Sequence, residues 1–394
     1  MSELAAHRWA SAEAMDAHGA WPSDTPWLPE AFEALPRDVF APDHLWDWDG
    51  HAYVPVDRAA DPDRWARLVY AGPYEAAITE VTDGRPTSSL SCTSVVADMI
   101  DSLDLTPGHR VLELGTGTGW NAALIAHHVG PTGSITSVEV DPALADLART
   151  TLTRAGVDVD VRAGDGAKGC PDNAPYQRII ATYAVDRIPH AWIEQLEPGG
   201  DLVFPWGRLG HFALTLDATG TTATGWCQGL AQFMGARDTT PTPTFDDIHT
   251  RHPTVDHEHE ITCDLAPLCT NNVMWALRVA LPDVRYTITA PGQDGTTVRA
   301  HDGAVSWATL TTTRDDDHVL VREGGPRRLA DELLAAWDRW VDDGRIRLYD
   351  YGMTVTPAEQ YVWAGDPDTG RRWPIRDPHR SGVDTRDELR PARP

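Results

Sequence analysis

The sequence predicts an α/β protein built on a doubly wound parallel sheet, and two observations predict it. Apolar, strand-like runs alternate with helical segments between residues 87 and 210. The first of these runs, residues 111–114, leads directly into Gly115, Gly117 and Gly119. Because glycine has no side chain, such a turn lets the backbone pass close beneath a ligand. The carboxyl end of this strand is therefore the expected position of a cofactor site.

The segments around the glycine turn are typical of successive strand–helix units. Asp141 suits the N-cap of the second helix, and Pro142 suits its first turn. Strands alternating with helices at this spacing indicate a Rossmann-like domain. The predicted strands cover residues 111–114, 134–140, 157–162, 178–182 and 201–205, and the predicted helices cover residues 121–129, 142–155 and 189–196.

The composition divides the chain into four parts. We predict an N-terminal helical lead-in over residues 1–86 that packs on a cofactor-binding core over residues 87–210. An additional C-terminal α+β domain is expected over residues 211–366, followed by a polar tail over residues 367–394. An amphipathic helix is expected at residues 326–341, with one apolar face formed by Leu329, Leu333, Trp337 and Trp340.

The overall composition excludes several classes of protein. With 394 residues, of which 41% are hydrophobic, the chain is long enough for two or three globular domains. A formal net charge of −26 argues against duplex nucleic acid as a partner, because DNA binding requires Lys and Arg against the phosphates. The sequence shows neither a transmembrane run nor a secretory signal, and its five cysteines are scattered. We therefore expect a cytoplasmic protein with no membrane partner.

The polar residues after three successive strands indicate the cofactor. The spacing Gly-x-Gly-x-Gly after Glu113 differs from the nicotinamide fingerprint Gly-x-Gly-x-x-Gly and resembles motif I of S-adenosylmethionine (SAM) methyltransferases. Glu139 ends the second strand, where a carboxylate can accept hydrogen bonds from both ribose hydroxyls. Asp165 and the flexible Gly166 follow the third strand and are placed to meet the adenine edge. Together they predict SAM as the cofactor; a nicotinamide-binding or non-catalytic domain of the same fold is the alternative.

A narrower resemblance rests on four segments of the chain. They resemble the protein-L-isoaspartate (D-aspartate) O-methyltransferase family over about half of the chain. The first contains the element Pro-Arg-x-x-Phe-x-Pro, the second lies where the family has its active-site Ser-x-Pro loop, the third is motif I, and the fourth follows the later family signature. These segments are residues 34–42, 87–93, 113–119 and 174–203.

The resemblance implies a role for each matching residue. Ser91 would be the active-site serine, and Ser89, Thr182 and Tyr183 would contact the substrate. The residues implied to contact SAM are Ser88, Glu113, Gly115, Gly117, Thr118, Gly119, Glu139, Asp165 and Gly166. One departure affects the serine loop, because Thr93 replaces the usual proline of the family and leaves the backbone angle φ unfixed there.

The implied reaction is methylation of an aspartyl side-chain carboxylate, which leads to a succinimide and then to aspartate or isoaspartate. The chain is longer than repair enzymes of this family. In its layout it resembles actinobacterial homologues that tailor ribosomally made peptides of the lanthipeptide type. The peptide or protein substrate would then be recognised by the additional C-terminal domain. Two alternatives stay open, a repair enzyme for damaged proteins and an inactive peptide-binding scaffold.

A group of histidines and cysteines follows the core, but its spacing does not match a zinc finger or ribbon. We therefore expect no metal site there. The group consists of His249, His252, His257, His259, Cys263 and Cys269.

Overall fold

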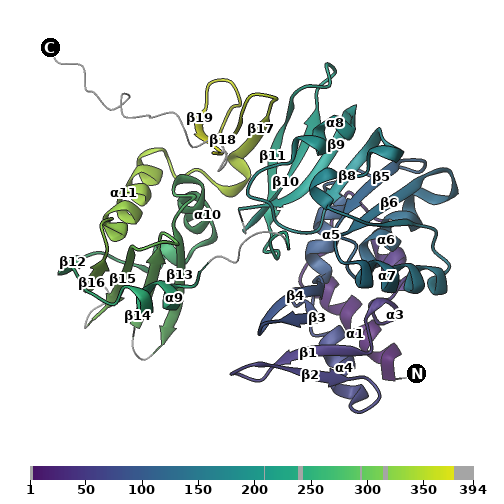
Figure 1. Cartoon of the computed structure of the whole chain (residues 1–394), viewed down its shortest axis with the longest axis horizontal. Helices are drawn as coiled ribbons and strands as arrows, with labels where there is room; N and C mark the ends of the chain where they lie inside the picture. Colours follow the sequence, from purple (N-terminus) through teal and green to yellow (C-terminus); the bar gives the residue numbers. More distant parts are fainter. Residues whose placement is uncertain (1–2, 208, 238–242, 293–294, 314–317, 377–394) are drawn as a thin grey trace.

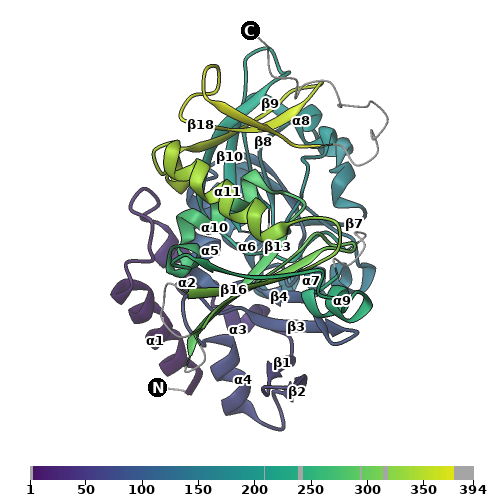
Figure 2. The ribbon, with the colours of Figure 1, turned by 90° about the vertical axis from the view of Figure 1, so that its left-hand side faces the viewer.

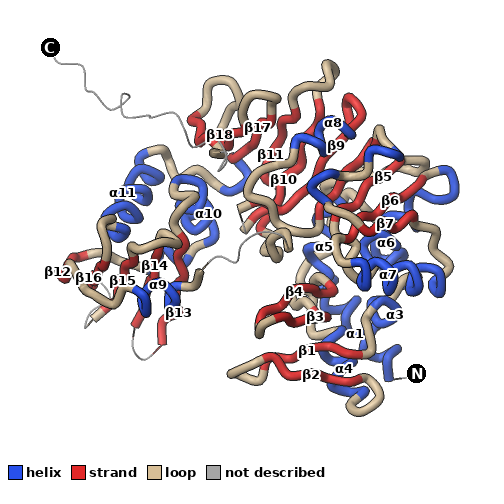
Figure 3. Tube along the Cα trace, in the orientation of Figure 1, coloured by secondary structure: helices blue, strands red, loops and turns tan. Residues whose placement is uncertain are grey.

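A ten-stranded sheet forms the centre of the computed structural model (Figures 1 and 3). The structure describes residues 3–207, 209–237, 243–292, 295–313 and 318–376. Five strands pair in parallel in the order β7-β6-β5-β8-β9, and five antiparallel strands continue the sheet as β10-β11-β17-β18-β19. The strands are β5 (Arg110–Leu114), β6 (Ser134–Glu139), β7 (Asp160–Ala163), β8 (Tyr176–Ala181), β9 (Leu196–Trp206), β10 (Gly210–Leu216), β11 (Ala223–Leu230), β17 (Tyr351–Val355), β18 (Gln360–Ala364) and β19 (Arg371–Pro374).

The parallel half of the sheet confirms the predicted doubly wound core. From β5 the chain runs outward through β6 and β7, then returns to the other side of β5 through β8 and β9. The carboxyl ends of β5 and β8 therefore form a topological switch point, which is where open α/β sheets bind ligands.

Different helices cover the two faces of this sheet. α5 (Thr93–Asp101), α6 (Trp120–Val129) and α7 (Pro142–Ala155) pack on one face. α8 (His190–Gln195) and α10 (Asn271–Ala280) pack on the other. Alternate residues of β5 join the two hydrophobic clusters, as the two-residue period of a strand requires.

The N-terminal part differs from the predicted helical lead-in, because it also contains a four-stranded antiparallel sheet in the order β2-β1-β3-β4. Short hairpins explain the difference: the turn after β1 is held by Asp49, whose carboxylate accepts the backbone N–H of His51 and Ala52. The elements are α1 (Glu3–Ala17), α2 (Leu28–Ala34), α3 (Arg37–Phe40), β1 (His44–Trp48), β2 (Tyr53–Asp57), α4 (Pro62–Val69), β3 (Ala77–Thr82) and β4 (Arg85–Leu90).

A second α+β unit is inserted between β11 and β17 and lies nearest the viewer in Figure 2. Its sheet has the order β12-β16-β15-β14-β13, with α10 and α11 on one side and α9 on the other (Figure 1). We call it the inserted domain. Its elements are α9 (Phe245–Arg251), β12 (His257–Thr262), β13 (Arg285–Gly292), β14 (Gly295–His301), β15 (Trp307–Thr312), β16 (His318–Gly324) and α11 (Leu329–Asp342), together with α10.

The boundary predicted after residue 210 falls inside the central sheet. β10 begins at that point and pairs with β9, and β17 to β19 extend the same sheet after the inserted domain. The late helix predicted over residues 326–341 is present as α11. The predicted polar tail contributes β19, and its residues 377–394 lie outside the described residues. No helix in the described ranges is both long and apolar enough to cross a membrane.

Candidate active site

The glycine loop lies at the switch point, between β5 and α6. Gly115, Gly117 and Gly119 have φ angles of 100°, 53° and 85°, in the left-handed region that favours glycine. A side chain at Gly115 would collide with the Thr182 hydroxyl and lie 3.1 Å from the Tyr183 ring. A side chain at Gly117 would meet no described atom within 4 Å. The loop is therefore packed against β8 on one side and open on the other, next to the N-terminus of α6.

Glu139 stands beside the open part of the loop, at the end of β6. Its carboxylate accepts the backbone N–H of Gly117 at 2.9 Å and that of Asp141 at 3.1 Å. The residue is 5% exposed. Because an ionised carboxylate has about four acceptor positions, the two that remain are available to hydroxyl groups of a ligand.

Glu113 lies beneath the loop and has no exposed surface. Its carboxylate accepts a hydrogen bond from Asn121 Nδ2 at 2.8 Å and another from the Ser137 hydroxyl. Burial raises the pKa of Glu113 to about 7, although these two hydrogen bonds act in the opposite direction. Glu113 therefore supports the loop from below through Asn121 and Ser137, and its contact with the cofactor, implied by the resemblance, stays a prediction.

Thr182 and Tyr183 follow β8 and border the loop. The Thr182 hydroxyl donates to the carbonyl oxygen of Gly115, which holds the start of the loop against β8. The Tyr183 ring lies between the two predicted glycine positions, since a side chain on Gly166 would approach its hydroxyl to 2.5 Å. Trp192 Nε1 donates to the carbonyl oxygen of Gly166 at 2.9 Å and packs edge-on to Tyr183. The structure thus brings together the regions of Gly115, Gly166 and Tyr183.

Asp165 caps the short turn that contains Gly166. One carboxylate oxygen accepts the N–H of Ala167 at 2.9 Å, and the other is 3.4 Å from Lys168 Nζ. The side chain is about two-fifths exposed. Asp165 therefore retains an accessible oxygen at the carboxyl end of β7.

The serine loop connects β4 to α5. Ser88 and Ser89 belong to β4, where Ser88 is buried and Ser89 half-buried, and Ser91 follows the strand. The Ser91 hydroxyl is half-buried and makes no hydrogen bond to any residue in the described ranges. Thr93 stands at the first position of α5, where a proline would be tolerated. Its hydroxyl donates to the carbonyl oxygen of Pro73 at 3.3 Å, so a tertiary contact anchors the loop in place of a ring.

A buried arginine, for which the sequence pattern predicts no role, supports the serine loop. Arg37 is 3% exposed, donates to the carbonyl oxygen of Leu90 at 3.1 Å and lies over the Trp120 ring at 5.2 Å. Burial lowers the pKa of Arg37 to about 10, so the group still carries its charge at neutral pH. The Pro-Arg element of the sequence was its only signal.

A second arginine joins the two sides of the site. Arg237 pairs with Asp141 at 2.9 Å, and also with Glu80 of β3. It donates to the carbonyl oxygen of Thr87, next to Ser88, at 3.2 Å. Arg237 follows β11, and the same segment pairs with residues just after β8 through the bridge between Ala184 and Gly235. Arg237 therefore ties the hairpin of the serine loop to the helix that follows Glu139.

The predicted histidine and cysteine group is dispersed. His257 and His259 lie on β12, an exposed edge strand of the inserted domain, and His249 packs on Trp307 through its ring. In the part of the chain that the structure describes, no three His, Cys, Asp or Glu side chains are grouped as metal ligands.

Comparison with known proteins identifies the segment that holds this site. Residues 24–218 match the family model described as Protein-L-isoaspartate(D-aspartate) O-methyltransferase. The chain is also similar to the protein-L-isoaspartate O-methyltransferases of Methanopyrus kandleri, with 46% identity over 121 residues, and of Pyrococcus horikoshii, with 48% identity over 120 residues. Each alignment covers 30% of this chain and 54% of the relative, so the chain spans about half the length of the curated relatives it matches.

A solved structure described as a protein-L-isoaspartate O-methyltransferase aligns with 91% of this chain and 100% of its own, at 19% identity and a TM-score of 0.47. The inserted domain and β17 to β19 lie beyond the family match. The glycine loop, the serine loop and Glu139 all lie within residues 24–218, the segment that matches the protein-L-isoaspartate(D-aspartate) O-methyltransferase family.

Proposed function

We propose that the chain is a SAM-dependent O-methyltransferase that methylates side-chain carboxylates of aspartyl or isoaspartyl residues in a peptide or protein. The observation that carries the proposal is the open glycine loop beside Glu139, inside the segment that matches the family. An inactive scaffold is disfavoured, because the predicted cofactor-binding residues keep free acceptors and free space.

The residues present fit SAM. The open space above Gly117 accommodates a ligand close to the backbone, and the remaining acceptors of Glu139 suit two vicinal hydroxyls. The N-terminus of α6 lies next to the loop and favours an anionic group such as an amino-acid carboxylate. Asp165 offers an acceptor at the carboxyl end of the neighbouring strand.

Methyl transfer to a carboxylate depends on the alignment of the acceptor with the methyl group, and it requires no proton transfer. Bound SAM supplies an electrophilic methyl group on a sulfonium sulfur. The acceptor carboxylate is already ionised at neutral pH, so it can attack without a general base. The Ser91 hydroxyl is free to donate to one carboxylate oxygen and orient the other. The rings of Tyr183 and Trp192 pack at the carboxyl end of β8 and limit the entry of water.

The proposed activity is compatible with two kinds of substrate, damaged proteins and a dedicated peptide. The curated relatives are named protein-L-isoaspartate O-methyltransferases, which fits a repair enzyme. The inserted domain lies wholly outside the matched segment and packs on the extended sheet through Trp275, which contacts Trp206 and Phe212. This additional domain favours a dedicated substrate, and we propose a ribosomally made, modified peptide whose aspartate is converted through a succinimide.

Methyl transfer tests the activity and its substrate. We expect an enzymatically cyclised, aspartate-containing peptide to gain a methyl ester faster than an unstructured isoaspartyl peptide, as followed by mass spectrometry. A faster reaction of the isoaspartyl peptide would favour the repair enzyme, and no ester on either peptide would refute the methyltransferase activity.

Ser91→Ala should lower kcat by about 10- to 100-fold, the value of a hydrogen bond to a charged group, with SAM affinity unchanged. Ser94→Ala, on the next helix, is the matched control.

Replacing Arg237 should loosen the connection between the hairpin of the serine loop and the start of α7, and so speed the release of the cofactor. The side chain is about three-tenths exposed, so we expect Arg237→Ala to cost only about 1 kcal/mol, seen as an approximately fivefold faster release of SAM in stopped-flow measurements. Arg237→Lys should lie between, because an ammonium cannot span two carboxylates as a guanidinium does. Arg322→Ala removes an exposed pair with Glu258 in the inserted domain and should leave release unchanged. Equal release rates in all four proteins would show that the contacts of Arg237 do not help to retain SAM.

A further inference from the structure

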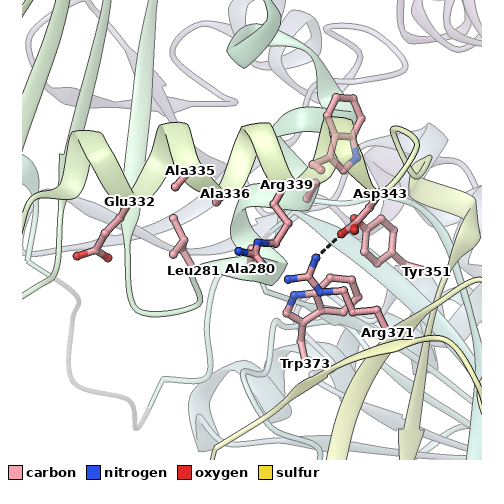
Figure 4. A pocket seen from close by; sticks show the side chains of 12 residues that line it. Ala280, Leu281, Glu332, Ala335, Ala336, Arg339, Asp343, Tyr351, Arg371 and Trp373 are labelled. Atoms are coloured by element: carbon pink, nitrogen blue, oxygen red, sulfur yellow. Dashed lines mark hydrogen bonds and ion pairs between the residues drawn. The ribbon is translucent and has the colours of Figure 1, made fainter. Parts of the chain in front are cut away.

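Arg37 is a buried cation without a carboxylate partner. Two arginines are buried in the part of the chain that the structure describes, and the other, Arg178, lies 3.3 Å from the Asp201 carboxylate. In the pocket between the inserted domain and the extended sheet, Arg371 likewise pairs with Asp343 (Figure 4). Arg37 is 3% exposed, forms no ion pair with any described side chain, and its buried Nε has no hydrogen-bond partner among them. Burial of this charge therefore costs free energy that no ion pair recovers.

The titratable groups around Arg37 do not cancel its charge. The adjacent carboxylate of Asp38 accepts two hydrogen bonds at 2.7 Å from Arg8 and another from the Tyr70 hydroxyl, so it is already paired. Burial lowers the pKa of Arg37 to about 10, and the groups that act in the opposite direction are the Cys92 thiol and the Tyr70 phenol. The guanidinium therefore stays charged at neutral pH, and no carboxylate among the described residues balances it.

The charge of Arg37 lies between the two loops of the site. Its Nη2 donates to the carbonyl oxygen of Leu90 at 3.1 Å, and the Cys92 side chain acts on it electrostatically, so these two neighbours stand on either side of Ser91 in the serine loop. On the other side, the guanidinium carbon is 5.2 Å from the ring centroid of Trp120, the first residue of α6 after the glycine loop. The acceptor carboxylate and the methyl donor must meet between these loops.

We propose that Arg37 is a positioning residue whose charge attracts the ionised acceptor carboxylate and holds it at the serine loop. The inference rests on the proposed function and names the group that selects the ionised form of its substrate. A chain with a net charge of −26, and with Glu139 and Asp165 at the site, otherwise repels a carboxylate. A buried positive charge offsets this repulsion, because water and salt screen it less than an exposed one.

The direction of charge transfer determines which kinetic constant Arg37 affects. An electron pair of the carboxylate oxygen forms the new bond to the methyl carbon, and the carbon–sulfur pair returns to sulfur, which leaves a neutral ester and a neutral thioether. The negative charge on the acceptor therefore decreases toward the transition state. Arg37 stabilises the bound carboxylate at least as much as the transition state, so it should lower KM without raising kcat. The neutral ester loses this attraction and is released.

Two replacements separate the charge of Arg37 from its hydrogen bond to the serine loop. Arg37→Gln keeps an N–H donor without the charge, and Arg37→Lys keeps the charge. With whichever of the two test peptides gains the ester faster, we expect Arg37→Gln to raise KM about tenfold without lowering kcat, and Arg37→Lys to stay within about threefold of the unmodified chain. SAM affinity should not fall in either variant, because the cofactor is itself a cation. Arg154→Gln is the matched control, since this exposed arginine donates to the carbonyl oxygen of Val39 in α3.

The pH profile of kcat gives a second measurement that a purely structural role would not change. Its acidic limb reports the carboxylate in the bound complex, whose pKa the charge of Arg37 holds down. We expect the limb to move up by about 0.5–1 pH unit in Arg37→Gln and to return in Arg37→Lys. Glu113 also titrates near neutral pH, but Arg37 is not among the groups that act on it, so its contribution is the same in every variant.

Peptide binding to the unmodified chain keeps the test independent of how well the variants fold. With S-adenosylhomocysteine, the thioether left after transfer, the acid peptide should bind about tenfold more tightly than the same peptide with its acceptor carboxyl converted to an amide. Equal affinity of acid and amide would overturn the proposal, as would a KM that rises equally in Arg37→Gln and Arg37→Lys. Absence of methyl transfer by the unmodified chain would refute the proposed function instead.

Discussion

Replacing Gly115 with alanine is expected to reduce kcat/KM by about 100-fold, because the new methyl group has no room. Gly115 has a φ of 100°, and its Cβ would collide with the Thr182 hydroxyl and press on the Tyr183 ring. Relief requires the loop to move away from β8, toward the space that the cofactor would use. Calorimetry with SAM and methyl-transfer rates measure the effect.

A matched glycine separates collision from backbone strain. Gly156 ends α7 with a φ of 71°, and a side chain there would meet no described atom within 4 Å. Gly156→Ala should therefore cost about 1 kcal/mol of stability and leave SAM affinity unchanged. Adding Thr182→Ala to Gly115→Ala should recover part of the lost kcat/KM, since it removes the hydroxyl oxygen involved in the collision. Identical behaviour of the two glycine variants would contradict this explanation.

Glu139→Ala is expected to weaken SAM binding by about 1.5–3 kcal/mol, or roughly 10- to 100-fold in Kd. The carboxylate would lose its hydrogen bonds to the ligand and also its bond to the N–H of Gly117, which shapes the loop. Glu139→Gln retains one acceptor oxygen and should lie between the two. Thermal unfolding in the absence of SAM shows how much of the effect arises from the loop itself.

Asp146→Ala provides the control for this measurement. Asp146 lies on the exposed side of α7 and pairs only with Arg149 among the described side chains. Its removal should leave SAM affinity as it is. An unchanged affinity in Glu139→Ala would show that the hydroxyls of the cofactor lie elsewhere.

The parts of the fold that local chemistry determines could be predicted from sequence. α7 was expected over residues 142–155 and is observed over the same residues, because Asp141 caps its start and Gly156 ends it. The glycine loop and β8 followed from the same kind of local pattern. β7 is shorter than expected and starts at Asp160, since the preceding residues have no strand partner.

Long-range pairing set the limit of prediction. The local sequence of β10 does not indicate that this strand continues the central sheet. Its position depends on antiparallel pairing with β9 and β11. Arg237 could not be assigned either. Its partners Glu80 and Asp141 are 157 and 96 residues away, and only the folded chain brings them together.

Because the inserted domain lies between β11 and β17, the central sheet cannot be completed until that domain has been synthesised. Tyr351, Met353 and Val362 belong to the same buried cluster as Trp206 and Phe212. A ribosome must therefore translate the whole inserted domain before the strands that finish this cluster exist. A chain that ends at residue 218 would contain the matched segment but leave β10 without β11 and the strands beyond it. Its unpaired edge would favour self-association over an autonomous enzyme.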